Sequence, residues 1–360
     1  MVGFIKDIDT PVKCQNIAQK NNALDCLDDI SLKCFREAYV IAKVSGDTPV
    51  LITGENGCGK TGYAQLMCSQ GRISGASGKK SMLNVNCAAF SENLIASELF
   101  GHKKGAYTGA DKDRDGRIKE AEKNGYLFLD EIGDLPLQAQ AMLLRFFQDK
   151  EIQPLGSDVA YKIEKPLKVV CATNKNLREE IRAGRFREDL FNRINKFHVH
   201  VPPLRERPKD CTQNAKNFLE RFVKLQNGAA WTKQLRIDEN FHDDNRKSKY
   251  KWPGNFRELE NRIYNAFVKK IMIGDNVVCF KDLFEDDEYI ESVGTSGSSF
   301  EGFGLPTNLV LPKFDLEAKL HKIERDYIQK AIKQCNGNKS EAAKLLGYSN
   351  YQKMDRKLQG

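Results

Sequence analysis

The most specific chemical pattern in this sequence is the string GENGCGKT, which lies between an apolar run and a helical pattern. It matches the phosphate-loop pattern G-x-x-x-x-G-K-[ST] in the strand-then-helix context that such a loop requires. Glycines let backbone N–H groups face phosphates, and the N-terminus of the next helix adds positive potential. We expect Lys60 to reach the terminal phosphates and Thr61 to bind Mg²⁺. The predicted nucleotide-binding residues are Gly54, Glu55, Asn56, Gly57, Cys58, Gly59, Lys60 and Thr61.

A pair of adjacent carboxylates ends the apolar run YLFLDE. We expect Asp130 to hold the hydrated Mg²⁺ and Glu131 to orient the attacking water. A strand that ends in Asp-Glu is a weak signal alone. In combination with the phosphate loop it predicts hydrolysis of a nucleoside triphosphate.

Two further groups of residues have two interpretations each. Thr173 and Asn174 end the run VVCATN, where they either sense the terminal phosphate and position water or form an ordinary strand-end turn, which Asn favours. Arg187 and Arg193 lie six residues apart in GRFREDLFNRI. Their planar guanidinium groups suit a phosphoryl group in transfer, although an isolated pair is also typical of a solvated basic face.

The elements that must position these residues alternate between strand and helix. Apolar runs at 50–53, 81–86, 125–132 and 167–174 are separated by helical stretches, which predicts an α/β fold with a parallel sheet and helices on both faces. Residues 211–285 predict a smaller helical domain. Residues 291–312 are rich in Gly, Ser and Pro and predict a linker. Beyond it, helical spacing of apolar residues from Leu316 to Ile332 predicts a helix that Gly337 ends.

Composition and charge limit the class of protein. Lys and Arg total 57 against 49 Asp and Glu, and we count 11 against 6 in residues 313–360, which indicates a polyanion partner for the tail. The ten cysteines form no C-x-x-C pair, which favours reduced, mostly buried thiols. Neither a membrane-spanning run nor a signal peptide is visible, so we expect a cytoplasmic protein without a membrane partner.

Residues 111–122 match the calcium-loop pattern D-x-[DN]-x-[DN]-G-x₅-E. A calcium loop of this type needs a helix on each side. Gly101, Gly105 and Gly109 break any entering helix, and Gly125 begins a strand shortly after Glu122. We therefore interpret this stretch as a solvated connector.

Four long strings identify a family resemblance. NCAAFSENLIASELFGHKKGAYTGA, GYLFLDEIGDLPL, GRFREDLFNRINKFHVHVPPLRERPKD and WPGNFRELEN closely resemble the AAA+ domain of bacterial enhancer-binding proteins, the sigma-54-dependent transcriptional activators. The string GNKSEAAKLLGYSN resembles their Fis-type helix-turn-helix. The resemblance implies a AAA+ P-loop NTPase sheet with a helical lid, followed by a small all-α DNA-binding domain.

The resemblance also implies roles that the residues alone do not give. Asn86 becomes the switch that holds Glu131 until the γ-phosphate is engaged. Arg187 and Arg193 become fingers that reach a neighbouring subunit, so the active species is a homo-oligomer, usually a hexamer, and a dimer when inactive. Arg257 becomes the lid sensor of the nucleotide. The loop predicted to contact sigma-54 is Gly105, Ala106, Tyr107, Thr108, Gly109 and Ala110, with Tyr107 where the family normally has Phe.

The tail has two interpretations of its own. It offers a helix, a turn at Gly347 and a second helix, which either enters a major groove of double-stranded DNA or forms a small helical cap with a charged face. The basic excess and the resemblance favour DNA. The predicted DNA-binding residues are Asn350, Tyr351, Lys353, Arg356 and Lys357.

The predicted domains are a short N-terminal segment at 1–29, an α/β ATPase subdomain at 30–207, a helical lid at 208–286, a linker at 287–312 and the helix-turn-helix at 313–360. Only residues 1–29 precede the resemblance, so we expect control by a partner protein, by expression level or by a domain missing from this sequence. The segment 238–251 is unusually polar for a lid helix, and the sequence offers no reason for this.

The sequence thus predicts an ATPase that uses ATP and Mg²⁺ to remodel the closed sigma-54 RNA polymerase complex at promoters, bound to an upstream DNA site. A rival hypothesis is a DNA-binding regulator in which nucleotide controls only assembly. A third is a remodeller of another protein with a nonspecific basic tail. Intact GAYTGA and Glu131 favour the first, because a passive regulator needs neither.

Overall fold

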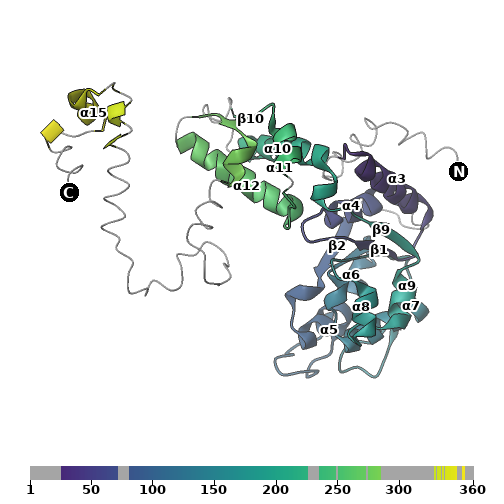
Figure 1. Cartoon of the computed structure of the whole chain (residues 1–360). Helices are drawn as coiled ribbons and strands as arrows, with labels where there is room; N and C mark the ends of the chain where they lie inside the picture. The colour runs from purple at the N-terminus through teal and green to yellow at the C-terminus, as the bar shows by residue number, and fades with distance from the viewer. Residues whose placement is uncertain are drawn as a thin grey trace. The chain divides into compact units, whose positions relative to one another are not determined.

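The structure of this chain is a computed structural model (Figure 1). It describes residues 26–71, 81–225, 235–248, 250–272 and 275–284, and in the tail residues 328–329, 331–333, 335, 337–346 and 351–352. The chain divides into two compact units, 1–293 and 294–360. The division falls within the predicted linker, and the predicted domain boundaries stay predictions.

A five-stranded parallel sheet forms the centre of the first unit, in the order β2-β5-β8-β1-β9. Its strands are β1 Val50–Thr53, β2 Ser81–Asn86, β5 Gly125–Asp130, β8 Lys168–Thr173 and β9 Phe197–His200. The four predicted strands and the predicted parallel α/β class are confirmed. The carboxyl ends of parallel strands meet at one edge, so Thr53, Asn86, Asp130 and Thr173 end side by side.

The fifth strand, β9, was not predicted. It lies at the edge of the sheet beside β1, and of its four residues only Val199 is buried. The alternating His198 and His200 side chains are exposed. A strand that is half covered shows alternation over too few residues to stand out from its helical neighbours.

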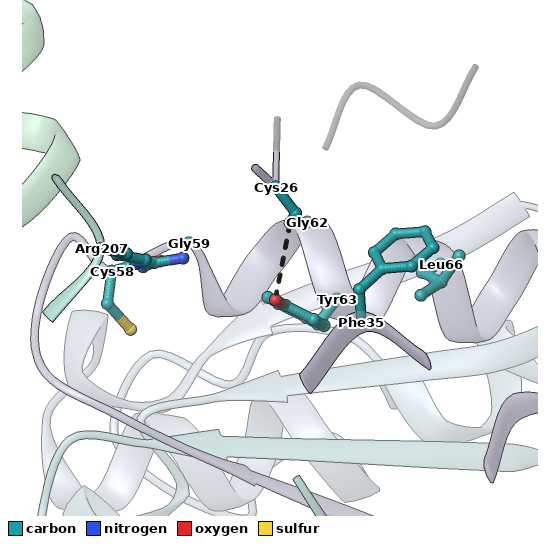
Figure 2. Close-up of a pocket in the computed structure, with 8 residues that line it drawn as sticks. All are labelled: Cys26, Phe35, Cys58, Gly59, Gly62, Tyr63, Leu66 and Arg207. Atoms are coloured by element: carbon teal, nitrogen blue, oxygen red, sulfur yellow. Dashed lines mark hydrogen bonds between the residues drawn. The ribbon is translucent and has the colours of Figure 1, made fainter. Parts of the chain in front are cut away.

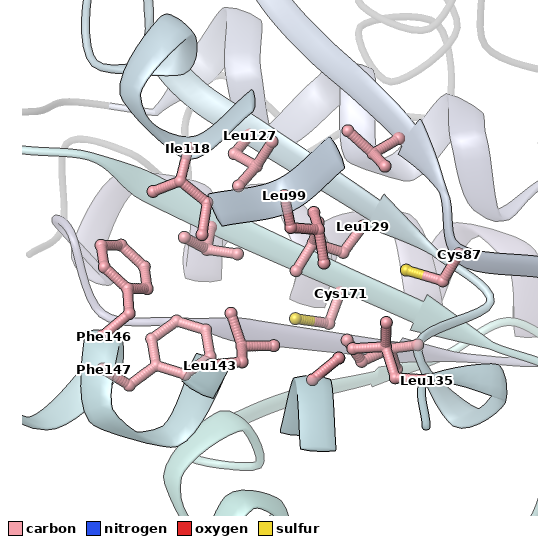
Figure 3. Packing of buried hydrophobic residues seen from close by; sticks show 14 of the residues in the cluster. Cys87, Leu99, Ile118, Leu127, Leu129, Leu135, Leu143, Phe146, Phe147 and Cys171 are labelled. Atoms are coloured by element: carbon pink, nitrogen blue, oxygen red, sulfur yellow. The ribbon is translucent and has the colours of Figure 1, made fainter. Parts of the chain in front are cut away.

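Alternate side chains of the central strands enter two separate cores. Val50, Ile52 and Phe128 pack beneath α3 Asp29–Val44 and α4 Lys60–Gln70. Leu51, Leu127 and Leu129 face the opposite way, toward α5 to α9, and Figure 3 shows Leu127, Leu129 and Cys171 packed against Leu99, Ile118 and Leu143. This period of two buries both faces of the sheet, as a doubly covered parallel sheet requires.

The helices of the second face and the smaller elements complete the α/β body. The helices are α5 Glu92–Phe100, α6 Arg117–Ala121, α7 Leu137–Asp149, α8 Leu177–Arg182 and α9 Glu188–Ile194. Short 3₁₀ turns are η1 Cys87–Ala89, η2 Ile132–Asp134 and η3 Leu204–Glu206. Two antiparallel ribbons are β3 Gly101–His102 with β4 Arg114–Asp115, and β6 Glu151–Ile152 with β7 Tyr161–Lys162.

The lid has its own core and a small ribbon that was not predicted. It consists of α10 Pro208–Leu225, α11 Phe241–Ser248, α12 Asn255–Met272 and η5 Phe280–Phe284, with β10 Arg236–Ile237 pairing β11 Val277–Val278. The polar segment 238–251 now has an explanation. Phe241 within it and Trp252 directly after it are fully buried, and the indole N–H of Trp252 donates to the buried Asn245 at 3.1 Å. Phe241, Asn245 and Trp252 thus anchor a stretch in which Glu239, Asn240 and Asp243 are exposed.

In the tail the structure describes α15 Lys339–Leu345, which Asn338 caps by accepting from the N–H of Glu341. Gly337 takes a left-handed φ of 89° before it, as expected for a residue that ends a helix. The nine cysteines within the described residues are free, and seven are buried, as predicted. No helix in the described part of the chain is both long and apolar enough to cross a membrane.

Candidate active site

The phosphate loop joins β1 to α4 in the predicted strand-loop-helix arrangement. Gly57 has a φ of 74°, and a Cβ built there would lie 2.3 Å from the backbone oxygen of Gly254 in the lid. Gly59 has a φ of 103° immediately before α4. A side chain at Gly57 would therefore both strain the loop and push the lid away.

Lys60 is folded back over this loop. Its ammonium group donates to the backbone oxygens of Gly54 at 3.0 Å and Glu55 at 3.2 Å. The same nitrogen lies 3.7 Å from Glu131, and only 7% of the Lys60 side chain is exposed. The lysine is thus fixed between the phosphate loop and the carboxylate predicted to orient water.

Asp130 and Glu131 lie at the end of β5, at the sheet edge that faces this loop. Glu131 has a left-handed backbone, with φ 52° and ψ 49°, which is uncommon for a residue with a side chain. One of its carboxylate oxygens accepts from the backbone N–H of Asn174 at 3.2 Å. Thr173 is buried and its hydroxyl accepts from the N–H of Lys175, so its side chain serves the strand-end turn.

One cleft brings together most of the predicted nucleotide residues. Its lining from the body is Asn56, Gly57, Gly59, Lys60, Thr61, Asp130 and Glu131. The lid closes it with Phe218 and Arg221 of α10 and with Phe256, Arg257 and Glu260 of α12. Arg257 was predicted here. The other four lid residues were not, because the sequence carries no signal for which faces of α10 and α12 meet the body.

An amide of the lid and an ion pair from the segment just before the lid hold the phosphate loop. The buried side chain of Asn255 donates to Glu55 at 3.1 Å and to the backbone oxygen of Asn56 at 3.0 Å, and accepts from the N–H of Leu204 at 2.7 Å. Arg205 pairs with both carboxylate oxygens of Glu55, at 2.7 and 2.9 Å. The hydrogen bond from Arg205 lowers the pKa of Glu55. The loop therefore stays tied to two later segments.

Arg207 makes a second connection to the phosphate loop, beside a small cavity. Figure 2 shows Arg207 and Cys58 at one end of this cavity, and Phe35 and Leu66 at the other. Arg207 is 1% exposed, donates to the backbone oxygen of Cys58 at 2.6 Å and lies over the ring of Phe256. Burial raises the pKa of the Cys58 thiol, so this loop cysteine is a buried, protonated group, as expected.

Reciprocal hydrogen bonds from two aspartates join the start of α3 to the start of α10. Asp28 accepts from the N–H groups of Lys209 and Asp210, and Asp210 accepts from those of Leu27 and Asp28. Asp210 is fully buried, and burial raises its pKa. Each carboxylate thus accepts from backbone N–H groups at the start of the other helix, so moving the lid away from α3 breaks both sets of hydrogen bonds.

Asn86, Arg187 and Arg193 do not line the cleft of their own chain. Asn86 accepts from the N–H of Ala88 at 2.9 Å, and among the described residues no hydrogen bond joins it to Glu131. Arg187 forms a two-point ion pair with Asp189 and is 42% exposed. Arg193 donates twice to the backbone oxygen of Phe147. Their predicted roles stay predictions.

The loop 105–110 projects from the ribbon β3–β4. Gly105 and Ala110 close it through a 2.9 Å backbone hydrogen bond, and its remaining turns leave Thr108 and Gly109 exposed. The ring of Tyr107 packs edge-on against His102, with ring centroids 5.1 Å apart. The loop is thus a compact, outward-facing turn with its aromatic residue held at the base.

Residues 111–122, which match the calcium-loop pattern, lie between loop 105–110 and β5. Asp113 pairs with Lys103 at 2.6 Å, and Asp115 pairs with Lys119 at 2.7 Å. Glu122 accepts from the backbone N–H groups of Glu164 and Lys165. Asp113, Asp115 and Glu122 therefore each have a partner within the protein, and in the described part of the chain no three His, Cys, Asp or Glu side chains gather as a group that could hold a metal ion.

Of the predicted DNA-binding residues, the structure describes only Tyr351, whose side chain is 44% exposed. Asn350, Lys353, Arg356 and Lys357 lie outside the described residues, as do the turn at Gly347 and most of the helix expected from Leu316.

The sheet order, the phosphate loop after β1, the Asp-Glu pair after β5 and the lid arginine define the AAA+ class of P-loop folds. Residues 29–200 match the family profile described as the Sigma-54 interaction domain, and residues 319–359 match that described as Bacterial regulatory protein, Fis family. The chain belongs to the family of sigma-54-dependent enhancer-binding transcriptional regulators.

Known relatives agree. The chain is 38% identical over 321 residues to the nitric oxide reductase transcription regulator NorR2 of Cupriavidus necator, which covers 87% of this chain and 58% of that protein. It is 37% identical over 303 residues to the transcriptional regulatory protein ZraR of Escherichia coli, with 84% and 61% covered. The chain thus spans about three fifths of the length of these relatives.

A solved structure shares the fold. NtrX from Brucella abortus in complex with ADP superposes with a TM-score of 0.64 at 22% identity, covering 99% of this chain and 72% of that one.

We predict that Asn255→Ala loosens the lid from the phosphate loop. The substitution leaves buried donors and acceptors unpaired and places Ala at a φ of 52°, so the free energy of unfolding should fall by about 2–3 kcal/mol. Hydrogen exchange should also quicken at the amide of Leu204. The matched control, Asn240→Ala on the exposed lid surface, should change neither, and an unchanged Leu204 amide in Asn255→Ala would refute the connection.

Proposed function

We propose that this chain is an ATP-hydrolysing transcriptional activator that remodels the closed sigma-54 RNA polymerase complex at promoters. The observation that carries the proposal is the cleft in which Lys60, Asp130, Glu131 and Arg257 meet, together with an exposed loop 105–110 in the same domain. Membership of the family supports both ATP hydrolysis and action on the sigma-54 complex. NtrX from Brucella abortus has been solved in complex with ATP and with ADP, which supports the choice of nucleotide.

The phosphate-loop residues, Glu131 and Arg257 each have a proposed task. The backbone of residues 54–61 and Lys60 bind the phosphates, and Arg257 binds them from the lid. Glu131 orients water, because its carboxylate is held by Lys60 and Asn174 at the end of the sheet. Thr173 and Asn174 position Glu131 through the turn that they form, and we keep Asn86 as the proposed switch.

The donor set of the cleft suits Mg²⁺. The hydroxyl of Thr61 and the carboxylate of Asp130 line the same space, and oxygen donors of this kind are those that Mg²⁺ prefers. Bound there with the nucleotide, the ion would neutralise charge on the phosphates. The residues of this chain would then hold the phosphate chain, place the water and exclude bulk solvent under the lid.

The active species is proposed to be a ring, with a hexamer as the expected size and a dimer as the inactive form. Arg187 and Arg193 are turned to their own chain's Asp189 and Phe147, away from their own cleft. Arg187 lies on the surface, where it can exchange Asp189 for the phosphates of a neighbouring subunit. The tail is proposed to bind double-stranded DNA upstream through Asn350, Tyr351, Lys353, Arg356 and Lys357.

Replacement of Glu131 separates nucleotide binding from hydrolysis. Glu131→Ala should retain ATP binding, since the phosphate ligands stay, while the rate of ATP hydrolysis falls by about 10²-fold or more. A filter-binding assay and a phosphate-release assay measure the two. Glu239→Ala, which removes an exposed carboxylate of the lid, is the control. Normal hydrolysis by Glu131→Ala would show that Glu131 takes no part in the reaction.

Replacement of Thr108 separates hydrolysis from transcription. Thr108 is exposed on the turn and distant in the chain from the cleft residues, so Thr108→Ala should hydrolyse ATP at the normal rate. Transcription from a sigma-54 promoter in a purified system should fall at least about tenfold. Ser91→Ala removes another exposed hydroxyl as the control. Normal activation by Thr108→Ala would show that the role assigned to the loop is wrong.

A further inference from the structure

The nucleotide cleft contains an arginine for which the proposed mechanism has no use. Arg221 of α10 lines the cleft together with Lys60, Thr61 and Arg257. Its side chain is 63% exposed, so it can change rotamer without disturbing the core. Its ion-pair partner is Glu260 of α12, at 3.7 Å.

The pair between Arg221 and Glu260 is weak. The distance from Nη1 to Oε1 exceeds that of a hydrogen bond, and ion pairs of such exposure contribute little to stability. Glu260 also has a closer partner, because the hydroxyl of Tyr264 donates to it at 2.9 Å. Release of Arg221 therefore leaves Glu260 hydrogen-bonded, and the arginine can leave at small cost.

The position of Glu260 places Arg221 on the lid side of the cleft, the side that also carries Arg257. Glu260 and Arg257 are three residues apart on α12 and lie on one face of that helix. Arg221, which meets Glu260, therefore lines the same cleft as Arg257, together with Gly59, Lys60 and Thr61 of the phosphate loop and α4. A guanidinium fork matches two phosphate oxygens far better than a single carboxylate oxygen at 3.7 Å.

We infer that Arg221 is a second lid arginine for the polyphosphate of the nucleotide, and that it exchanges Glu260 for phosphate oxygens when nucleotide binds. The inference rests on the proposed function, in which this cleft binds ATP. Arg221 makes the lid sensitive to the number of phosphates, and Glu260 acts as the competing anion that holds the arginine when the cleft has no nucleotide. The guanidinium carbon of Arg221 lies over the ring of Phe218, 5.9 Å from its centroid.

The test compares the affinities of the full chain for ATP, ADP and AMP, measured by competition with a fluorescent nucleotide. Arg221→Ala should weaken ATP binding by about tenfold and AMP binding by less than about twofold, because only the phosphate chain loses a partner. Glu260→Gln should strengthen ATP binding by about two- to fivefold, since it removes the competing charge. Arg236→Ala, which removes an exposed lid arginine outside the cleft, should change none of the three.

Arg221→Lys is the second variant, and thermal melting of all variants verifies that they fold. The lysine variant keeps the positive charge but loses the planar guanidinium fork, so its ATP affinity should fall between those of the unmodified chain and Arg221→Ala. Equal losses for ATP, ADP and AMP would overturn the inference, as they indicate contact with the base. An unchanged ATP affinity in folded Arg221→Ala would overturn it as well. Failure of the unmodified chain to bind ATP would instead overturn the proposed function, together with this inference.

Discussion

The buried side-chain amide of Asn255 joins three segments that are far apart in the chain: the phosphate loop at Glu55 and Asn56, the turn at Leu204, and the first turn of the lid helix α12. Each of its polar atoms has a partner inside the protein, so it cannot turn toward solvent without leaving unpaired groups. The shape of the phosphate loop therefore depends on the position of the lid. Gly57, whose missing side chain makes room for the backbone of Gly254, imposes the same dependence by sterics.

Arg207 and Asp210 extend this constraint to the first helix. Arg207 holds the loop carbonyl of Cys58, while Asp210 and Asp28 satisfy each other's helix ends. Because the buried groups are satisfied only together, α3, the loop and α10 move as one unit or separate at considerable cost. A nucleotide that moves the lid in such a molecule also moves the base of the phosphate loop. This provides a physical link between occupancy of the cleft and the conformation of the domain that carries loop 105–110.

The sequence was sufficient for the parts of the fold that depend on local chemistry. Three of the four predicted strands, β1, β5 and β8, have apolar runs that are buried on both faces, and the phosphate loop was predicted because its glycines and lysine are adjacent in the chain. The contacts between segments far apart in the chain were not predictable in this way. Glu55 and Arg205 pair across 150 residues, and Arg221 meets Glu260 only because α10 and α12 pack with particular faces together. The short edge strand β9 and the buried anchors of segment 238–251 were missed for the same reason, since their burial is decided by partners elsewhere.

The central claim is that nucleotide in the cleft controls engagement of the sigma factor by the loop, and native gel electrophoresis tests it most directly. The purified chain is loaded with ADP and a metal-fluoride mimic of the transferring phosphoryl group and then mixed with sigma-54. Our account predicts a stable complex that forms with this mimic and is absent without nucleotide. No complex, from protein shown to hydrolyse ATP, would contradict the account and indicate a different remodelling substrate or a regulator in which nucleotide controls assembly.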